Sequence, residues 1–260
     1  MISLFDTHAH YYDEKFNEDI ETLIESLRTK NEISPYPVGA ILNCSEDIES
    51  AKKCIELSEK YDIMYAAVGL HPHNANSYRT EMLEDIAALC KHEKVVALGE
   101  AGLDYHYDFS EKEKQIKAFS EQLALAHQLK LPIVIHDREA HGDCMQCVKE
   151  SPCRCGILHS FSASAELATE YCKLGFYISF SGSLTFKNAV NLQRAAKQIP
   201  RERILIETDS PYLSPVPYRG KRNDSSKMYH TALFLADILN ESVENITILT
   251  HENAKKVLNL

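Results

Sequence analysis

Short apolar runs alternate with longer segments of helical spacing along the whole chain. The runs are continuously apolar instead of alternating with polar residues, which is typical of strands buried on both faces of a parallel sheet. We expect eight such strands, at residues 2–5, 38–42, 63–69, 94–99, 131–135, 156–158, 176–179 and 203–206.

The segments between these runs have the spacing of amphipathic helices. Apolar residues recur every three or four positions after Ser110, and Ser110 and Glu113 fit the capping box that opens a helix. Segments 46–61 and 80–90 show similar spacing. We therefore predict a helix at each of these three places.

Eight strands that are each followed by a helical segment predict a TIM (β/α)8 barrel, formed as a single domain by residues 1–260. An open, doubly wound sheet of seven or eight strands is the alternative. No G-x-G-x-x-G motif follows an early strand, which argues against a dinucleotide-binding version of that sheet.

The net charge of −10 argues against a protein that coats nucleic acid through general electrostatics, although it allows local phosphate contacts through metal ions. We see no signal peptide and no apolar stretch of the ~18–20 residues that a membrane span needs. The sequence therefore predicts a cytoplasmic protein without a membrane partner. The eight cysteines are then expected to be mostly free thiols.

Six of the eight runs lead into His, Glu or Asp residues. A single His or carboxylate at a strand end is usually a structural hydrogen-bonding group, but in a barrel all of these ends open on one face. Four imidazoles and two carboxylates on one face have the composition of a metal site. We expect one ion at His8, His10 and Asp209, a second at His136 and His159, and Glu100 as a bridge between them.

Six ordered motifs resemble those of the TatD-type metal-dependent deoxyribonucleases, a family of amidohydrolase-like barrels. They run nearly from end to end of the chain: FDTHAHYYD (5–13), AVGLHPHNA (67–75), ALGEAGLDYH (97–106), LPIVIHDREAHGD (131–143), GILHSFSAS (156–164) and LIETDSPYLSPVPYRGKRN (205–223). Two loops depart from the family pattern. Asp224–Ser225 stand where Glu-Pro is usual, and HSFSAS lacks a common glycine.

The resemblance implies a TIM barrel that hydrolyses phosphodiester bonds in DNA, often as an exonuclease, with two divalent ions (Mg²⁺, Mn²⁺ or Zn²⁺). It places the metal centre on the same six residues and puts His71 and Arg138 near the substrate. Glu207 shares a face with Asp209 and would contact a ligand instead of the metal. Glu100 and Asp209 would be the catalytic carboxylates, with Asp209 accepting a proton from the attacking water.

Arg219, Lys221 and Arg222 follow the last strand and are candidates for binding phosphate, with a solvated loop as the alternative. Four aromatic residues in strand-end loops could stack on bases, although at least two are expected to be packing residues. They are Tyr105, Tyr107, Phe161 and Tyr212.

A separate cluster, Cys144, Cys147, Cys153 and Cys155, could bind structural zinc, but its cramped spacing favours free buried thiols. For the whole protein, DNA is the expected partner and a monomer the expected state. The alternative enzyme is a hydrolase of an amide, lactone or phosphoester on the same barrel. Such enzymes often carry a carboxylated Lys as the bridge, whereas Glu100 ends the fourth run here. A metal-bound module without activity is the non-enzymatic alternative, which the intact set of six ligands argues against.

Overall fold

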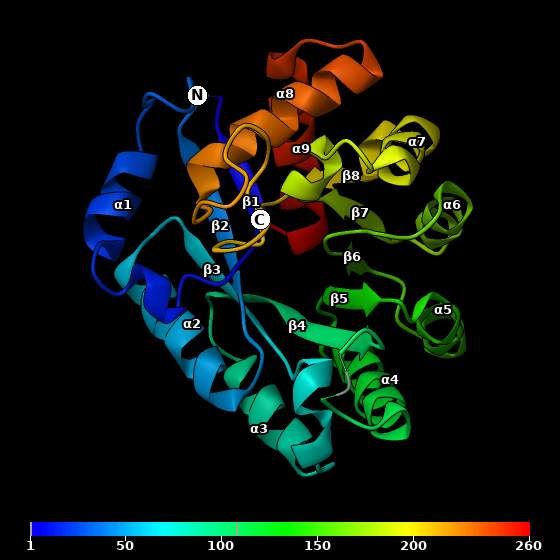
Figure 1. The fold of residues 1–260 in the computed structure, drawn as a ribbon. Helices are drawn as coiled ribbons and strands as arrows, with labels where there is room; N and C mark the ends of the chain where they lie inside the picture. Colours follow the sequence, from blue (N-terminus) through cyan, green and yellow to red (C-terminus); the bar gives the residue numbers. More distant parts are fainter. Residues whose placement is uncertain (1, 108) are drawn as a thin grey trace.

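The computed structural model describes residues 2–107 and 109–260. Eight strands form one sheet in chain order, with every neighbouring pair parallel, and the helices surround it (Figure 1). This architecture confirms the predicted barrel, and each apolar run coincides with a strand. The strands are β1 (Leu4–Ala9), β2 (Val38–Cys44), β3 (Met64–Val68), β4 (Val95–Asp104), β5 (Ile133–Arg138), β6 (Gly156–Leu158), β7 (Tyr177–Phe180) and β8 (Ile204–Ile206).

The barrel closes where β1 meets the segment that follows β8. An isolated parallel bridge joins Ala9 to Ser210. The His10 N–H donates to the Ser210 carbonyl at 2.7 Å, and the Asp209 N–H donates to the His8 carbonyl at 2.9 Å. Closure therefore brings the first strand's histidines beside Asp209 at the carboxyl ends of the strands.

The barrel interior is a packed core. One buried cluster takes at least one residue from each of the eight strands, including Phe5 of β1 and Leu205 of β8. Ala254, Val257 and Leu258 of the last helix belong to the same cluster, so this helix covers the end of the barrel opposite the polar residues. A filled interior leaves the carboxyl ends of the strands as the place for a site.

The helices pack outside the strands. Segments 46–61 and 80–90 form helices as predicted, and the first of them opens with a capping box between Asp47 and Ser50. The helices are α1 (Ile20–Leu27), α2 (Ile48–Lys60), α3 (Met82–Leu89), α4 (Lys112–Leu129), α5 (His141–Glu150), α6 (Ala165–Lys173), α7 (Val190–Gln198), α8 (Met228–Leu239) and α9 (Val243–Leu258).

The predicted capping box at Ser110 is wrong, although the helix after it exists. α4 begins at Lys112, and its N-cap, Glu111, makes no side-chain capping bond. The Ser110 hydroxyl instead donates to the His73 carbonyl at 2.8 Å and accepts the Asn76 N–H at 3.1 Å. It is used to fix a neighbouring loop, which local sequence spacing cannot show.

Short 3₁₀ helices lie in the loops. They are η1 (Glu14–Phe16), η2 (Pro72–Ser77), η3 (Gly182–Thr185), η4 (Arg201–Arg203) and η5 (Ser225–Lys227). Across residues 2–107 and 109–260, no helix has the length and apolar character needed to cross a membrane.

β4 extends beyond its predicted end, from Val95 to Asp104, so Glu100 lies inside the strand. Its pairing with β5 shifts register between Leu98 and Ala101. Gly102 has φ +154°, and a Cβ there would lie 1.9 Å from the His136 carbonyl oxygen. This close approach requires glycine and sets β4 against the strand that carries His136.

We predict that Gly102→Ala lowers the free energy of unfolding by at least about 2 kcal/mol, because the added methyl group meets backbone atoms that cannot move aside. Gly142→Ala is the matched control. A Cβ at this residue of α5 meets nothing within 4 Å, so stability should stay the same or rise by up to about 1 kcal/mol. Urea unfolding monitored by circular dichroism measures both changes, and equal stabilities would contradict the assignment.

Candidate metal centre

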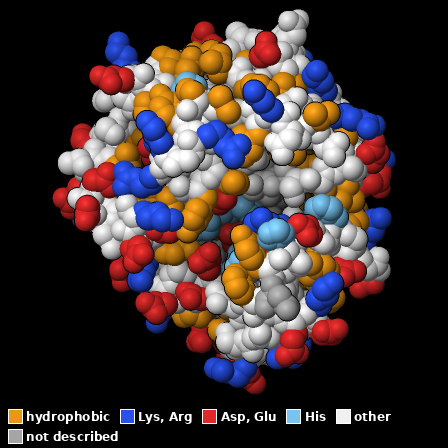
Figure 2. Space-filling model, viewed as in Figure 1, with side chains coloured by type: hydrophobic (Ala, Val, Ile, Leu, Met, Phe, Trp, Pro, Cys, Tyr) orange, Lys and Arg blue, Asp and Glu red, His pale blue; other side chains and the backbone are white. Residues whose placement is uncertain are grey.

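Histidine side chains gather at the carboxyl ends of the strands. In Figure 2 they line a hollow near the centre of the molecule. The structure brings all six predicted ligands to this place, on β1, β4 and β5 and on the segments that follow β1, β6 and β8.

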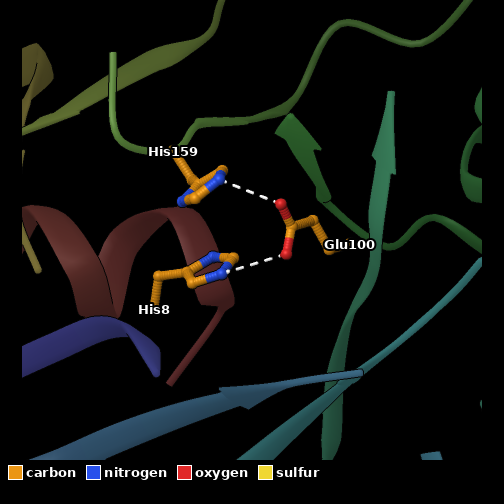
Figure 3. A group of neighbouring side chains, drawn as sticks. All are labelled: His8, Glu100 and His159. Atoms are coloured by element: carbon orange, nitrogen blue, oxygen red, sulfur yellow. Dashed lines mark ion pairs between the residues drawn. The ribbon is translucent and has the colours of Figure 1, made fainter. Parts of the chain in front are cut away.

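The Glu100 carboxylate lies between two groups of imidazoles. Its Oε1 is 2.8 Å from His136 Nδ1 and 2.9 Å from His159 Nε2, whereas its Oε2 is 3.2 Å from His8 Nε2 and 3.8 Å from His10 Nε2. Figure 3 shows His8 and His159 each facing a different oxygen of Glu100. This two-sided arrangement is the one that a bridging carboxylate needs.

Asp209 completes the side of the centre formed by β1. Its Oδ1 is 3.4 Å from His10 Nε2 and 3.8 Å from His8 Nε2. Asp209 has φ +59°, a left-handed backbone conformation that Asp adopts more readily than most residues. This turn directly after β8 aims the side chain back at the histidines.

Three overlapping groups of residues could hold a metal ion, with ligand atoms within 4.8 Å of one another. They are His8, Glu100 and His159; His8, His10 and Asp209; and His71, Glu100 and His136. The second group is the predicted first site. The third group contains His71, which the sequence had placed near the substrate and not among the ligands.

Three imidazoles are oriented by acceptors outside the centre. His10 Nδ1 donates to the Cys44 carbonyl at 2.9 Å, and His159 Nδ1 donates to Glu207 Oε1 at 3.2 Å. His136 Nε2 donates to Asp104 Oδ2 at 3.1 Å. In each ring the other nitrogen faces Glu100 or Asp209, as in metal sites where an outer hydrogen bond fixes the ligating tautomer. The ligating nitrogen and oxygen atoms of the centre therefore fit divalent metal ions.

His71 differs from these three rings. Its Nδ1 accepts the His73 N–H at 3.2 Å, so the neutral ring carries its hydrogen on Nε2, which lies 3.5 Å from Glu100 Oε1. Burial lowers the pKa of His71 to about 4, which keeps the ring neutral at pH 7. A nitrogen that carries a hydrogen is a donor and not a ligand, so His71 presents an N–H to the centre.

The charges of the centre are strongly coupled. Burial alone would raise the pKa of Glu100, but the electrostatic attraction of the facing imidazoles, that of His159 first, and the hydrogen bond from His136 hold it well below its usual range. Burial would lower the pKa of His10, but the Asp209 hydrogen bond and the charges of Glu100 and Asp209 raise it to about 9. Without metal, the centre therefore balances carboxylates against protonated imidazoles.

The sequence predicts no role for Asp104, the last residue of β4, or for His73 of η2. Asp104 Oδ2 accepts hydrogen bonds from both His73 Nε2, at 2.9 Å, and His136 Nε2. The available signal was the position of Asp104 in the GEAGLD segment, four residues after Glu100. When two carboxylates lie so close together on one strand, one can bind the metal and the other can orient a neighbouring histidine ligand.

The predicted phosphate-binding cations lie in the loop after β8 and line a pocket of about 460 Å³. Arg222 forms a bidentate pair with Asp19, at 2.6 and 2.8 Å. Within the described part of the chain, neither Arg219 nor Lys221 forms an ion pair. The pocket is lined by Lys15, Phe186, Pro211, Tyr212, Leu213, Ser214, Arg219, Gly220, Lys221 and Arg222.

The departure at Asp224 and Ser225 is accommodated locally. Asp224 caps η5, and the Ser225 hydroxyl donates to the buried Asp6 carboxylate at 2.6 Å. Asp6 also accepts the Thr208 N–H at 2.9 Å, next to Asp209. The altered loop therefore supports the backbone that carries Asp209 without removing a ligand.

The aromatic candidates separate by exposure. Phe161 is buried, and the Tyr105 hydroxyl donates to Asp143 at 2.6 Å, so both are packing or anchoring residues. Tyr107 and Tyr212 are exposed. Arg138 is also exposed, with its guanidinium 4.9 Å from the centre of the Tyr107 ring.

Among the described residues, no three of the four clustered cysteines bring their sulfur atoms together as metal ligands would. All eight cysteines are free thiols, and those of the cluster are not among the groups of residues whose ligand atoms converge within the described chain. Cys144, Cys147 and Cys153 are buried. Burial raises the pKa of each of these three thiols, which disfavours the thiolate that zinc needs.

Comparisons with known proteins agree with this geometry. The family model described as TatD related DNase matches residues 5–259. The chain is 42% identical over 259 residues to the Bacillus subtilis protein named uncharacterized metal-dependent hydrolase YabD, with 99% of both chains covered. It is 33% identical over 262 residues to the similarly named YcfH of Escherichia coli, covering 99% of this chain and 96% of the other. The crystal structure of YjjV, a TatD homologue from Escherichia coli, matches with a TM-score of 0.91 at 28% identity and covers both chains fully.

We predict that Asp104→Asn weakens metal affinity about 10- to 100-fold, because the amide loses the charge that orients and polarises His136. Isothermal calorimetry with Mn²⁺ or Zn²⁺ measures the affinity. Asp143→Asn is the matched control. The exposed Asp143 accepts a hydrogen bond from the Tyr105 hydroxyl and, among the described residues, forms none with a proposed ligand, so its replacement should leave the affinity unchanged. Equal affinities of the two variants would argue against a supporting role for Asp104.

We also predict that metal binding releases protons at pH 7. A histidine must be unprotonated to ligate, and the raised pKa values of His10 and His159 keep these rings protonated when no metal is present. The affinity should therefore rise as the pH rises toward 9, by about tenfold per pH unit for each proton released. Calorimetry in two buffers with different ionisation enthalpies measures this release, and identical heats in both would contradict it.

Proposed function

Because the chain belongs to the family of TatD-related DNases, we propose that it hydrolyses phosphodiester bonds in DNA with a metal-activated water, acting as an exonuclease. The broader activity, metal-dependent hydrolysis, is that of the family to which it belongs. We propose that residues 1–260 work as one barrel in the cytoplasm, as a monomer with DNA as substrate.

The observation that carries this proposal is the Glu100 carboxylate with imidazoles facing each of its oxygens. Two divalent ions (Mg²⁺, Mn²⁺ or Zn²⁺) held there would supply a Lewis acid for a phosphoryl oxygen and a water that ionises near neutral pH. Neutral imidazoles do not reduce the positive charge of such ions, and the two ligating carboxylates offset only part of it. The centre therefore remains attractive to a phosphodiester. The proposed ligands are His8, His10, Glu100, His136, His159 and Asp209.

Asp209 is the proposed general base. Facing histidine charges hold its pKa below its usual value against the effect of burial, so it is ionised at pH 7 and free to accept the proton of the attacking water. His71 donates its Nε2–H to a phosphoryl oxygen, where negative charge develops. Glu207 does not touch the substrate in this proposal. It accepts a hydrogen bond from His159 Nδ1 and so orients this proposed metal ligand.

Substrate phosphates are held by cations around the centre. Arg138 is the last residue of β5. Arg219 and Lys221 line the pocket formed by the loop after Asp209. Arg222, which the sequence also predicted to bind phosphate, instead forms a bidentate ion pair with Asp19 and lines the wall of this pocket. Among the described residues, Arg138, Arg219 and Lys221 form no ion pair, so these cations give the substrate a local site of opposite charge on an acidic protein.

The test uses end-labelled single- and double-stranded DNA with purified protein and Mg²⁺, Mn²⁺ or Zn²⁺. We expect metal-dependent, stepwise shortening from one end. Asp209→Asn should lower kcat about 10²- to 10⁴-fold at saturating metal, and Glu100→Ala should abolish activity. Asp143→Asn, which changes none of the proposed ligands, should retain full activity.

The proposal fails if folded, metal-loaded protein cleaves neither DNA. It also fails in part if Asp209→Asn keeps full turnover at saturating metal, because the base would then lie elsewhere. Metal-dependent hydrolysis of an amide, lactone or small phosphoester in place of DNA would favour the alternative barrel hydrolase.

A further inference from the structure

An exposed pair of aromatic rings lies at the rim of the metal centre and takes no part in the proposed chemistry. Tyr107 and Phe109 are 40% and 59% exposed, and Phe109 is the most exposed aromatic side chain in the described part of the protein. Their rings are parallel within 2°, with centres 5.3 Å apart, which is an offset stack. We call Tyr107 and Phe109 the aromatic shelf.

The aromatic shelf contacts the metal centre through His73 and Asp104. The His73 ring stands nearly perpendicular to both rings, 5.4 Å from Tyr107 and 4.9 Å from Phe109. His73 donates to the same Asp104 oxygen that accepts from the ligand His136. The other oxygen, Asp104 Oδ1, accepts the N–H groups of His106 and Tyr107. One carboxylate therefore positions both a metal ligand and the shelf.

The far end of the shelf is also held. The Phe109 carbonyl accepts a hydrogen bond from Asn76 Nδ2 at 2.9 Å, and Asn76 belongs to η2. The next residue, Ser110, bonds His73 and Asn76. These hydrogen bonds hold Tyr107 and Phe109 with a large part of each ring exposed to water, and this exposed area contributes nothing to folding. Two rings are also far too little surface for a stable protein interface.

We propose that the aromatic shelf binds a nucleobase of the substrate, stacking the base of a nucleotide that flanks the cleaved phosphodiester bond. This inference rests on the proposed function and adds a base-binding subsite to it. Aromatic rings stack on every base through their π-faces, so the subsite tolerates sequence. Arg138, over the Tyr107 ring, places a cation beside the stack for the phosphate of the same nucleotide.

The test compares wild type with Phe109→Leu, which keeps an apolar side chain but removes the ring, and with Phe109→Tyr, which keeps the ring. Substrates are short oligonucleotides in which an abasic residue is moved one position at a time from the cleaved end. On intact DNA, Phe109→Leu should raise KM about tenfold with little change in kcat, and Phe109→Tyr should match wild type.

The abasic series distinguishes stacking from a structural role. At one position, removing the base should raise the wild-type KM to that of Phe109→Leu and remove the difference between the two enzymes. If the difference persists at every position, or if both enzymes have equal KM on intact DNA, the subsite is overturned. Unchanged calorimetric affinity for Mn²⁺ in Phe109→Leu shows that the metal centre is intact.

A binding measurement keeps this proposal separate from the nuclease activity. 2-Aminopurine fluorescence is quenched when the base stacks, so a phosphorothioate-linked oligonucleotide carrying it should be quenched by wild type and by Phe109→Tyr but not by Phe109→Leu. If wild type cleaves no DNA, the proposed function fails, and the shelf is then judged by quenching alone. Equal quenching by wild type and Phe109→Leu, or none by wild type, overturns the shelf.

Discussion

The Glu100 carboxylate is the constraint on which the rest of the site depends. It is buried, and a buried charge is costly unless opposite charges and hydrogen bonds surround it. Imidazoles from β1, β5 and the segments after β3 and β6 surround it. The converging carboxyl ends of the closed parallel barrel bring these distant parts of the chain around one side chain. The charge balance of the site therefore depends on closure of the barrel.

The next layer of the structure orients those imidazoles. A backbone carbonyl holds His10, and the carboxylates of Glu207 and Asp104 hold His159 and His136. The exception is His71, whose Nδ1 accepts a backbone N–H and whose other nitrogen is therefore a donor. The direction of one hydrogen bond thus separates a proposed substrate contact from the ligands, although all of these rings face the same carboxylate.

The barrel and the convergence of the six ligands could be predicted from the sequence because both follow from local pattern. Continuous apolar runs mark buried parallel strands, and the polar residues after them must share one end of the barrel. Contacts between distant segments could not be predicted in this way. Arg222 pairs with Asp19 across 203 residues, and Ser110 bonds η2 instead of capping α4. The shared role of Asp104 depends on the register shift in β4, which places this carboxylate between two histidines.

The charge distribution limits how the proposed DNA substrate can approach this protein. With 38 acidic and 28 basic residues, most of the surface repels a polyanion, and the attraction is left to the metal centre and a few cations at its rim. Among these cations, Arg138 is the last residue of β5, and Arg219 and Lys221 lie in the loop after β8. A contact with so few phosphates would release few counterions, so the proposed DNA binding should depend less steeply on salt than binding by a protein that coats DNA. The negative surface therefore works with the rim cations, since it disfavours every approach except the one that leads to the metal centre.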